Sequence, residues 1–400
     1  MEQLFSHFNN IRRRDIAIVG AGIIGLSTAY AAAIQSAGTV KVTLYEAVET
    51  GHPDAASTDQ SRVFRHLHGP DSKYTIWAKE SGQRWDQISK SAGNDVLHRL
   101  GVLFLMHRRG DPNYVGGHIK PYNDPMEWML DSLQVLDDQK VSYLRLKAGQ
   151  LERQFPQFSP RVIEEAVLDQ NAGMLEADLA TSTLLRLCIE AGVKYQPDSR
   201  VTGVSTDNSS CIVELDGAKE VRHEAAVLAI NGWTSDLLQL PKGTLSLNEQ
   251  PMIYLEPPDG EHLFDQGTMP VFISLGNDCN GFPLHRGVIK VSDDNPYRSI
   301  DHPDQRNTMP STEIARVKEL VGGFIPLLKD AKVQRTHMCF YDRSKDGNFI
   351  LDRWDNNNQI IYGCGMSGRA FKFAPVIGER LARFVITGDR PSDITDLQIR

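Results

Sequence analysis

A glycine-rich turn between a short apolar run and an alanine-rich segment constrains the fold of this chain more than any other feature. Residues 16–20 form the apolar run, the turn reads Gly20-Ala21-Gly22-Ile23-Ile24-Gly25, and residues 23–36 have helical apolar spacing. In such a turn the first glycine permits the bend, the second lets the backbone approach a pyrophosphate, and the third lets helix and strand pack closely. The helix start at Ile23 and Ile24 offers free N–H groups to phosphate. The motif predicts a dinucleotide site.

An acidic residue strengthens this prediction. Residues 40–46 alternate as a second strand, and Glu46 ends it 21 positions after Gly25. An acidic side chain there can accept hydrogen bonds from ribose hydroxyls. The alternative is a purely structural glycine turn beside a surface glutamate, and the motif alone leaves FAD and NAD open.

Later segments return to the same strand–helix pattern, and we expect an α/β (α+β) fold. Residues 174–192 indicate a helix that ends at Gly192, and 225–232 a buried strand that runs into glycine. Residues 240–335 indicate mixed strands at 251–255, 271–275 and 287–291 and a helix over 311–322, and residues 107–126 indicate a loop. We therefore expect a Rossmann-like dinucleotide-binding domain built from discontinuous segments and a mixed-sheet substrate domain. The expected segments are 1–88, 160–238 and 338–400 for the first domain, and 89–159 and 239–337 for the second.

Composition argues against several classes of protein. The 400 residues carry a formal net charge of −8, which disfavours a nucleic-acid surface. No stretch approaches the roughly 18 apolar residues that span a bilayer, and the N-terminus does not resemble a secretory signal. The five cysteines are scattered without a CxxC pair, so we expect neither disulfides nor a metal site. A cytoplasmic protein is the expectation.

Motifs near both ends carry a family resemblance. Residues 61–65 read Ser61-Arg62-Val63-Phe64-Arg65, residues 339–342 read Cys339-Phe340-Tyr341-Asp342, and DGNFILD (346–352) and YGCGMSGRAFKFAPVIGE (362–379) follow. Together with the glycine turn, these segments resemble the monomeric sarcosine oxidase family of FAD enzymes in the D-amino acid oxidase-like superfamily. The family includes N-methyl amino acid, pipecolate and fructosyl amino acid oxidases. The resemblance is strong over 15–66 and 336–388 and thin over 240–335.

The resemblance implies roles for individual residues. It implies that Cys339 carries the flavin covalently through a thioether, that Arg62 lies beside the flavin, and that Arg65 and Lys372 bind a substrate carboxylate. It also implies that Lys290 lies over the flavin and assists oxygen activation, since a fixed cation stabilises developing superoxide. The further FAD contacts it implies are Ser61, Gly365, Met366, Gly368, Phe371 and Lys372.

Each of these roles has a plain alternative. Cys339 could be a buried apolar cysteine, the arginines could be surface residues, and Lys290 could face water from an edge strand.

The helix that opens at Ala374-Pro375 would direct its positive dipole at the flavin pyrimidine.

The substrate side departs from the family pattern. Asn280 stands where sarcosine oxidases have a tyrosine, no histidine occurs near Asp293 and Asp294, and Arg369 replaces a histidine before Ala370. Asn280, Arg369 and Tyr341 are therefore candidate substrate contacts beside Arg65 and Lys372. These changes argue against sarcosine itself and slightly favour a cyclic or bulkier secondary amine.

The expected activity is FAD-dependent oxidation of a small amino acid or secondary amine by molecular oxygen, which gives an imine and hydrogen peroxide. Three alternatives stay open: an amine dehydrogenase that passes electrons to a partner, a fructosyl amino acid oxidase, and a catalytically inactive flavin-binding scaffold. A monomer is expected by analogy with the family.

Overall fold

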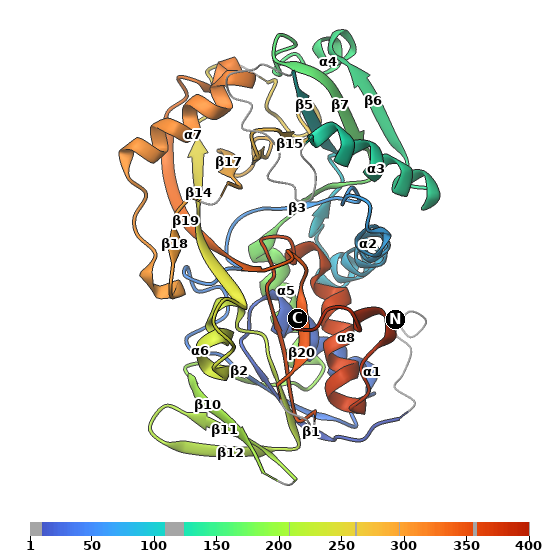
Figure 1. The fold of residues 1–400 in the computed structure, drawn as a ribbon, viewed down its shortest axis with the longest axis vertical. Helices are drawn as coiled ribbons and strands as arrows, with labels where there is room; N and C mark the ends of the chain where they lie inside the picture. The colour runs from blue at the N-terminus through green and yellow to red at the C-terminus, as the bar shows by residue number, and fades with distance from the viewer. Residues whose placement is uncertain are drawn as a thin grey trace.

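The computed structural model describes residues 10–108, 124–207, 209–260, 262–295, 297–354 and 358–399. Within these residues two large sheets lie at opposite ends of an elongated molecule, with helices packed on each (Figure 1). The mixed α/β class is confirmed. No helix in the described part of the chain is long and apolar enough to cross a membrane. The expected monomer and cytoplasmic location stay predictions.

The lower sheet contains the glycine turn. β1 pairs in parallel with β2 on one side and with β13 on the other, as a Rossmann-like unit requires. Only β20 runs antiparallel, at the sheet edge. In sheet order the strands are β20 (Ile350–Arg353), β21 (Ile360–Cys364), β13 (Ala225–Leu228), β1 (Asp15–Val19), β2 (Lys41–Tyr45) and β9 (Lys194–Gln196).

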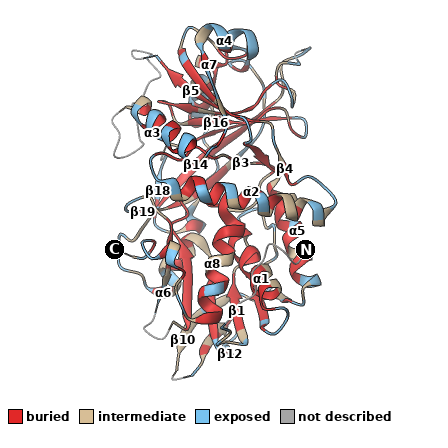
Figure 2. Cartoon of the chain, turned by 90° about the vertical axis from the view of Figure 1, so that its right-hand side faces the viewer, coloured by how far each residue is buried: buried red, intermediate tan, exposed pale blue. Residues whose placement is uncertain are grey.

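Four helices form a shared core with this sheet. They are α1 (Ile23–Gln35), α2 (Ser72–Ala92), α5 (Ala177–Glu190) and α8 (Ala374–Thr387). α1 is buried almost all round, because the sheet, α5 and α8 enclose its alanine-rich surface (Figure 2). α8 has Pro375 in its first turn and ends at Gly388, which has a φ of 73°. The segment 174–192 differs from the prediction at its start, because Met174 and Leu175 belong to a strand.

The upper sheet is mixed and has nine strands. Its long strand β14 (Leu245–Leu255) pairs with β17, β18 and β19. In sheet order the strands are β18 (Ser299–Ile300), β14, β17 (Ile289–Asp293), β16 (Cys279–Gly281), β15 (Val271–Leu275), β5 (Val102–His107), β7 (Ile163–Asp169) and β6 (Tyr143–Lys147). The ninth strand, β19 (Val333–Ser344), pairs with β14. Three helices border it: α3 (Pro125–Asp138), α4 (Ala148–Gln154) and α7 (Ser311–Phe324).

Smaller elements complete the described chain. One three-stranded sheet contains β10 (Val201–Thr206), β11 (Cys211–Leu215) and β12 (Lys219–His223), and another contains β3 (Arg62–Phe64), β8 (Gly173–Leu175) and β4 (Leu97–His98). The short helices are α6 (Thr234–Leu238), η1 (Asn231–Trp233), η2 (Pro303–Gln305), η3 (Pro326–Leu328), η4 (Phe371–Phe373) and η5 (Ser392–Ile394).

The two sheets suggest where domains divide. We propose a division that follows sheet membership, with β7 and β19 in the upper unit. The expected boundaries at 160 and 338 would place β7 with the lower sheet and cut β19. Most of the expected loop over 107–126 lies outside the described residues, and α3 already begins at Pro125.

Candidate active site

A single cavity of about 1460 Å³ contains most of the residues predicted from sequence. It exceeds the roughly 300–1,000 Å³ of ordinary small-ligand pockets, so it has room for a large cofactor and a substrate together. Residues of both large sheets line it. The predicted residues that line it are Gly20, Gly22, Ile23, Ile24, Glu46, Arg62, Arg65, Asn280, Lys290, Cys339, Tyr341, Met366, Gly368, Arg369, Phe371 and Lys372. The predicted residues Gly25, Ser61 and Gly365 do not.

The glycine turn forms one end of this cavity. Gly20 has a φ of 94°, and a Cβ on Gly25 would lie 1.8 Å from the Gly20 carbonyl oxygen, so Gly25 permits the contact between helix and strand. No side chain caps the start of α1 at Gly22, although the Ile23 N–H donates to Ser57 Oγ at 2.9 Å. This leaves a helix N-terminus facing the cavity, which favours an anionic group.

Glu46 lies beside the turn, as predicted. Its carboxylate accepts hydrogen bonds from the Ala21 N–H at 2.6 Å and the Ala47 N–H at 2.8 Å. Each carboxylate oxygen can accept further bonds, so ribose hydroxyls still find acceptors here. The helix terminus, the close glycine contact and this carboxylate together fit the pyrophosphate and ribose of FAD.

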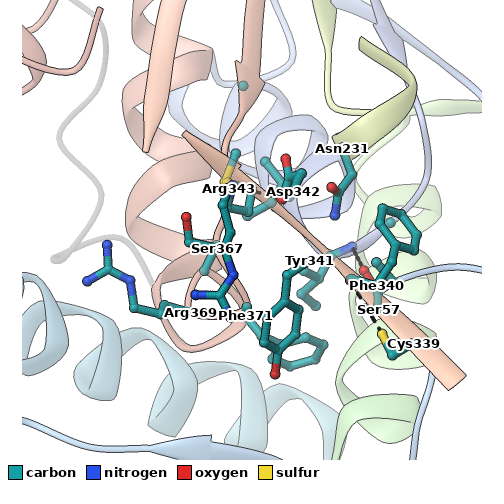
Figure 3. Close-up of a pocket in the computed structure, with 18 of the residues that line it drawn as sticks. Ser57, Asn231, Cys339, Phe340, Tyr341, Asp342, Arg343, Ser367, Arg369 and Phe371 are labelled. Carbon is teal, nitrogen blue, oxygen red and sulfur yellow. Dashed lines mark hydrogen bonds between the residues drawn. The ribbon is translucent and has the colours of Figure 1, made fainter. Parts of the chain in front are cut away.

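β19 brings two predicted residues to the middle of the cavity. Cys339 and Tyr341 are two positions apart and therefore lie on one face of the strand (Figure 3). Cys339 is 3% exposed. The Tyr341 hydroxyl donates to Asp294 at 3.1 Å. A thiol and a phenol thus face the middle of the cavity.

A buried ion cluster holds the predicted cations Arg62 and Lys290. Arg62 donates to the Asp59 carboxylate at 2.7 Å, Lys290 Nζ pairs with the same carboxylate, and Tyr254 donates to it at 2.7 Å. Lys290 also donates to the Ser61 carbonyl at 3.0 Å. Ser61 therefore helps to position Lys290, although it does not line the cavity. The edge-strand alternative for Lys290 is wrong, because the residue is 2% exposed on a central strand.

Burial and charge set the protonation of this cluster. Burial lowers the pKa of Lys290 to about 8, although Asp59 opposes the shift. The pKa of Asp59 lies below its ordinary value: burial raises it, but the charges of Lys290 and Arg62 outweigh that effect. Asp59 therefore stays ionised, and Lys290 changes charge near physiological pH.

A second group of cations consists of Arg65, Lys372 and Arg369. Arg65 donates to the Leu67 carbonyl, and Lys372 donates to the Arg369 carbonyl at 2.8 Å. Trp85 of α2 positions Lys372 by donating to its main-chain oxygen at 2.9 Å. Neither Arg65 nor Lys372 forms an ion pair with a described carboxylate.

Burial and neighbouring cations lower the pKa values of Arg65 and Lys372, although the charge of Asp294 opposes both shifts. Burial, and then the charge of Arg369, lower the pKa of Arg65 to about 10. Burial and then Arg65 hold the pKa of Lys372 well below its ordinary value. Arg369 donates to the Gly347 carbonyl and lies 5.0 Å from the Tyr74 ring, away from Cys339 (Figure 3). An anion bound by Arg65 and Lys372 would remove an electrostatic cost.

Asp342 organises the turn before α8. Its carboxylate accepts hydrogen bonds from the N–H groups of Gly365 at 2.7 Å and Met366 at 2.9 Å. Burial raises the pKa of Asp342 to about 7. Gly365 therefore shapes the loop that presents Met366, Gly368 and Phe371 to the cavity.

Several site residues were missed from sequence. Asp59 lies in the loop before β3 and precedes Arg62 by three positions, which was a weak signal. Asp278, Asp294 and His68 also line the cavity. His68 is 7% exposed, its Nε2 lies 3.0 Å from the Arg65 carbonyl oxygen, and burial keeps its pKa well below the ordinary value. No motif marked these three.

Comparisons with known proteins show the family of this chain. A family model described as FAD dependent oxidoreductase (DAO) matches residues 15–384. The chain is 22% identical to the monomeric sarcosine oxidase of Bacillus sp. (strain B-0618), over 96% of this chain and 95% of the other. It is 27% identical to the peroxisomal sarcosine oxidase of Mus musculus, over 92% and 90%. The solved structure of NikD, an unusual amino acid oxidase essential for nikkomycin biosynthesis, shares the fold, with a TM-score of 0.78, 20% identity and coverage of 96% and 97%.

Proposed function

Because the chain belongs to the DAO family of FAD-dependent oxidoreductases, we propose that it oxidises a small amino acid or secondary amine, of the N-methyl or cyclic imino acid type, with oxygen as acceptor. The observation that carries this proposal is the pair Arg65 and Lys372. Both face the cavity that begins at the glycine turn, and neither forms an ion pair with a carboxylate of the described chain. Two such cations select a substrate with a carboxylate.

Bound FAD would supply a two-electron oxidation of a C–N bond, which yields an imine, and transfer of those electrons to oxygen, which yields hydrogen peroxide. The chain contributes binding and orientation. The start of α1 and Glu46 would hold the pyrophosphate and ribose, and Arg62 would lie beside the ring. The Lys290 ammonium would stabilise negative charge that develops on oxygen.

Arg65 and Lys372 would orient the substrate. Their two positive charges would fix the carboxylate, so that the carbon next to nitrogen points at the ring position. The apolar wall that includes Phe282 and Phe371 would exclude water around that carbon. We also propose that Cys339 holds the flavin through a thioether, because its thiol faces the middle of the cavity.

Anaerobic mixing tests the proposal. The purified holoenzyme is mixed with N-methyl amino acids, pipecolate and proline, and flavin absorbance near 450 nm is followed. We expect bleaching with at least one of them, and Lys372→Met should weaken that substrate's binding by about 30-fold or more, because an anion then loses half of its binding pair. Unchanged absorbance with every secondary amine would contradict the proposed substrate class.

The same preparation separates the alternatives. Oxygen consumption and peroxide in step with substrate loss support an oxidase, whereas turnover that requires an added electron acceptor indicates a dehydrogenase. Reduction only by fructosyl amino acids would move the substrate to that class. A flavin that no amine reduces would leave a flavin-binding scaffold.

A further inference from the structure

An acidic group lies in the same cavity as the cations. Lys290 and Ser292 of β17 and Asp294, the residue after this strand, all line the cavity, because alternate residues share one face of a strand. Asp278 lines the cavity from the turn before β16, and its main-chain oxygen accepts from the Asp294 N–H at 2.7 Å. Two carboxylates therefore stand together at one end of β17.

These carboxylates form no ion pair within the described residues, although the charge of Arg343 opposes the rise in the pKa of each. No lysine, arginine or histidine nitrogen of that part of the chain forms an ion pair with Asp278 or Asp294. Arg343, the cation nearby, donates to the main-chain oxygen of Asp294 at 3.0 Å. Asp294 accepts neutral hydrogen bonds instead, from Asn280 at 2.8 Å and from Tyr341. Burial and then Asp294 raise the pKa of Asp278 to about 7.

Ser292 gives a second, independent sign that a ligand belongs here. Its side chain is 2% exposed and lines the cavity between Lys290 and Asp294. Its hydroxyl has no hydrogen-bond partner among the described residues. A buried hydroxyl without a partner costs free energy that a bound polar group would recover.

We propose that the substrate carries a second, cationic nitrogen, and that Asp278 and Asp294 bind it while Arg65 and Lys372 bind the carboxylate. The substrate is then an amino acid with a basic side chain. This inference rests on the proposed function, since it takes the cations as the carboxylate site. Asn280 and Tyr341 become positioning residues that hold the Asp294 carboxylate toward the ligand.

The reacting nitrogen does not account for the acidic group. An amine gives up hydride only when it is uncharged, and a permanent pair with two carboxylates would keep it protonated. Asp294 also lies four residues from Lys290, which is about 13 Å along a strand. The carboxylates are therefore placed for a nitrogen away from the carbon that is oxidised.

Matched ligands test this inference in the holoenzyme without turnover. Hexanoate and 6-aminohexanoate differ only in a terminal ammonium, as do butyrate and 4-aminobutyrate. Their dissociation constants are measured from the perturbation of flavin absorbance. We expect the amino compound of at least one pair to bind about tenfold more tightly, because a charged hydrogen bond is gained. Equal binding, or preference for the plain acids, would overturn the inference.

Two variants test which residues cause the preference for the amino compound. In the double variant Asp278→Asn/Asp294→Asn the preference should fall below about threefold, since the amides keep the size and shape of the side chains but lose the charge. Asp54→Asn, a carboxylate at another part of the cavity wall, should leave the preference unchanged. A preference that survives the double variant would overturn the assignment to these residues.

Different results would contradict the carboxylate site of the proposed function and the second, cation-binding site. If no carboxylate perturbs the flavin, the anion site of the proposed function is wrong and the inference falls with it. If the plain acids bind and a neutral N-methyl amino acid such as N-methylnorleucine reduces the flavin as fast as Nα-methyl-lysine, only the second site is wrong.

Discussion

Lys290 shows how one buried residue depends on its neighbours for its charge. Burial, and then the charge of Arg62, lower its pKa, and the Asp59 carboxylate offsets part of that shift. With a pKa of about 8, the ammonium is charged at pH 7 and largely neutral at pH 9. Its proposed role at the oxygen step requires the charged form, so the role predicts a pH dependence.

We expect the rate at which oxygen reoxidises the reduced flavin to fall as pH rises from 7 to 9. Lys290→Met should lower that rate by about 100-fold at pH 7 and abolish this pH dependence, because the cation that stabilises developing negative charge is gone. Stopped-flow absorbance measures it, with Lys242→Met, an exposed lysine, as control. A profile in Lys290→Met that matches the unmodified protein would exclude Lys290 from the step.

Asp59 shows what the sequence could not predict at this scale. Its contact with Lys290 joins residues 231 positions apart in different elements. A motif can indicate Arg62 because the short segment that contains it recurs among members of a family. A pairing between a loop and a distant strand leaves no such local pattern in the sequence. The same holds for Asp294 and Tyr341, which meet only because β17 and β19 both pair with β14.

At the scale of elements, prediction succeeded where the signal was local. β1, the glycine turn, α1 and β2 follow one another without interruption, and Pro375 marks the start of α8, so spacing and turn residues were sufficient. Segment 174–192 was predicted as helix throughout, but its first residues pair with β3 and β4. Pairing with distant strands decided that case, and helical spacing could not reveal it.

The contact between β1 and α1 gives the prediction at this scale. Gly25→Ala would place a methyl 1.8 Å from the Gly20 carbonyl oxygen, so the helix must shift away from the strand. We expect a loss of about 1–3 kcal/mol in unfolding free energy and weaker FAD binding. Urea unfolding measures the first effect, and FAD titration in a Cys339→Ser background, from which the flavin can be withdrawn, measures the second.

Gly149→Ala provides the control for that substitution. A Cβ on Gly149, in α4, meets only Arg153 at 3.9 Å, so the same change should be neutral or stabilise by up to about 1 kcal/mol. If both substitutions behave alike, close packing of the turn does not explain the need for Gly25.

At the scale of the whole molecule, the cavity lies where the two sheets meet. The lower sheet supplies the glycine turn and Glu46, whereas β17 and β19 of the upper sheet supply Lys290, Cys339 and Tyr341. A cofactor bound there would contact both units at once. Its binding free energy would then stabilise the folded molecule as a whole, because the unfolded chain has no such cavity.

Cys339→Ser makes this linkage measurable, since it removes the proposed thioether and allows FAD to be withdrawn and returned. We expect the melting temperature of the FAD-free variant to rise steadily with added FAD, with about 2.7 kcal/mol gained at a free concentration 100 times the dissociation constant. Differential scanning calorimetry follows the transition. Because FAD would join both sheets, the loaded variant should unfold in one transition. A melting temperature that does not respond to FAD, or a separate transition that FAD leaves in place, would show that the cofactor does not join the two sheets.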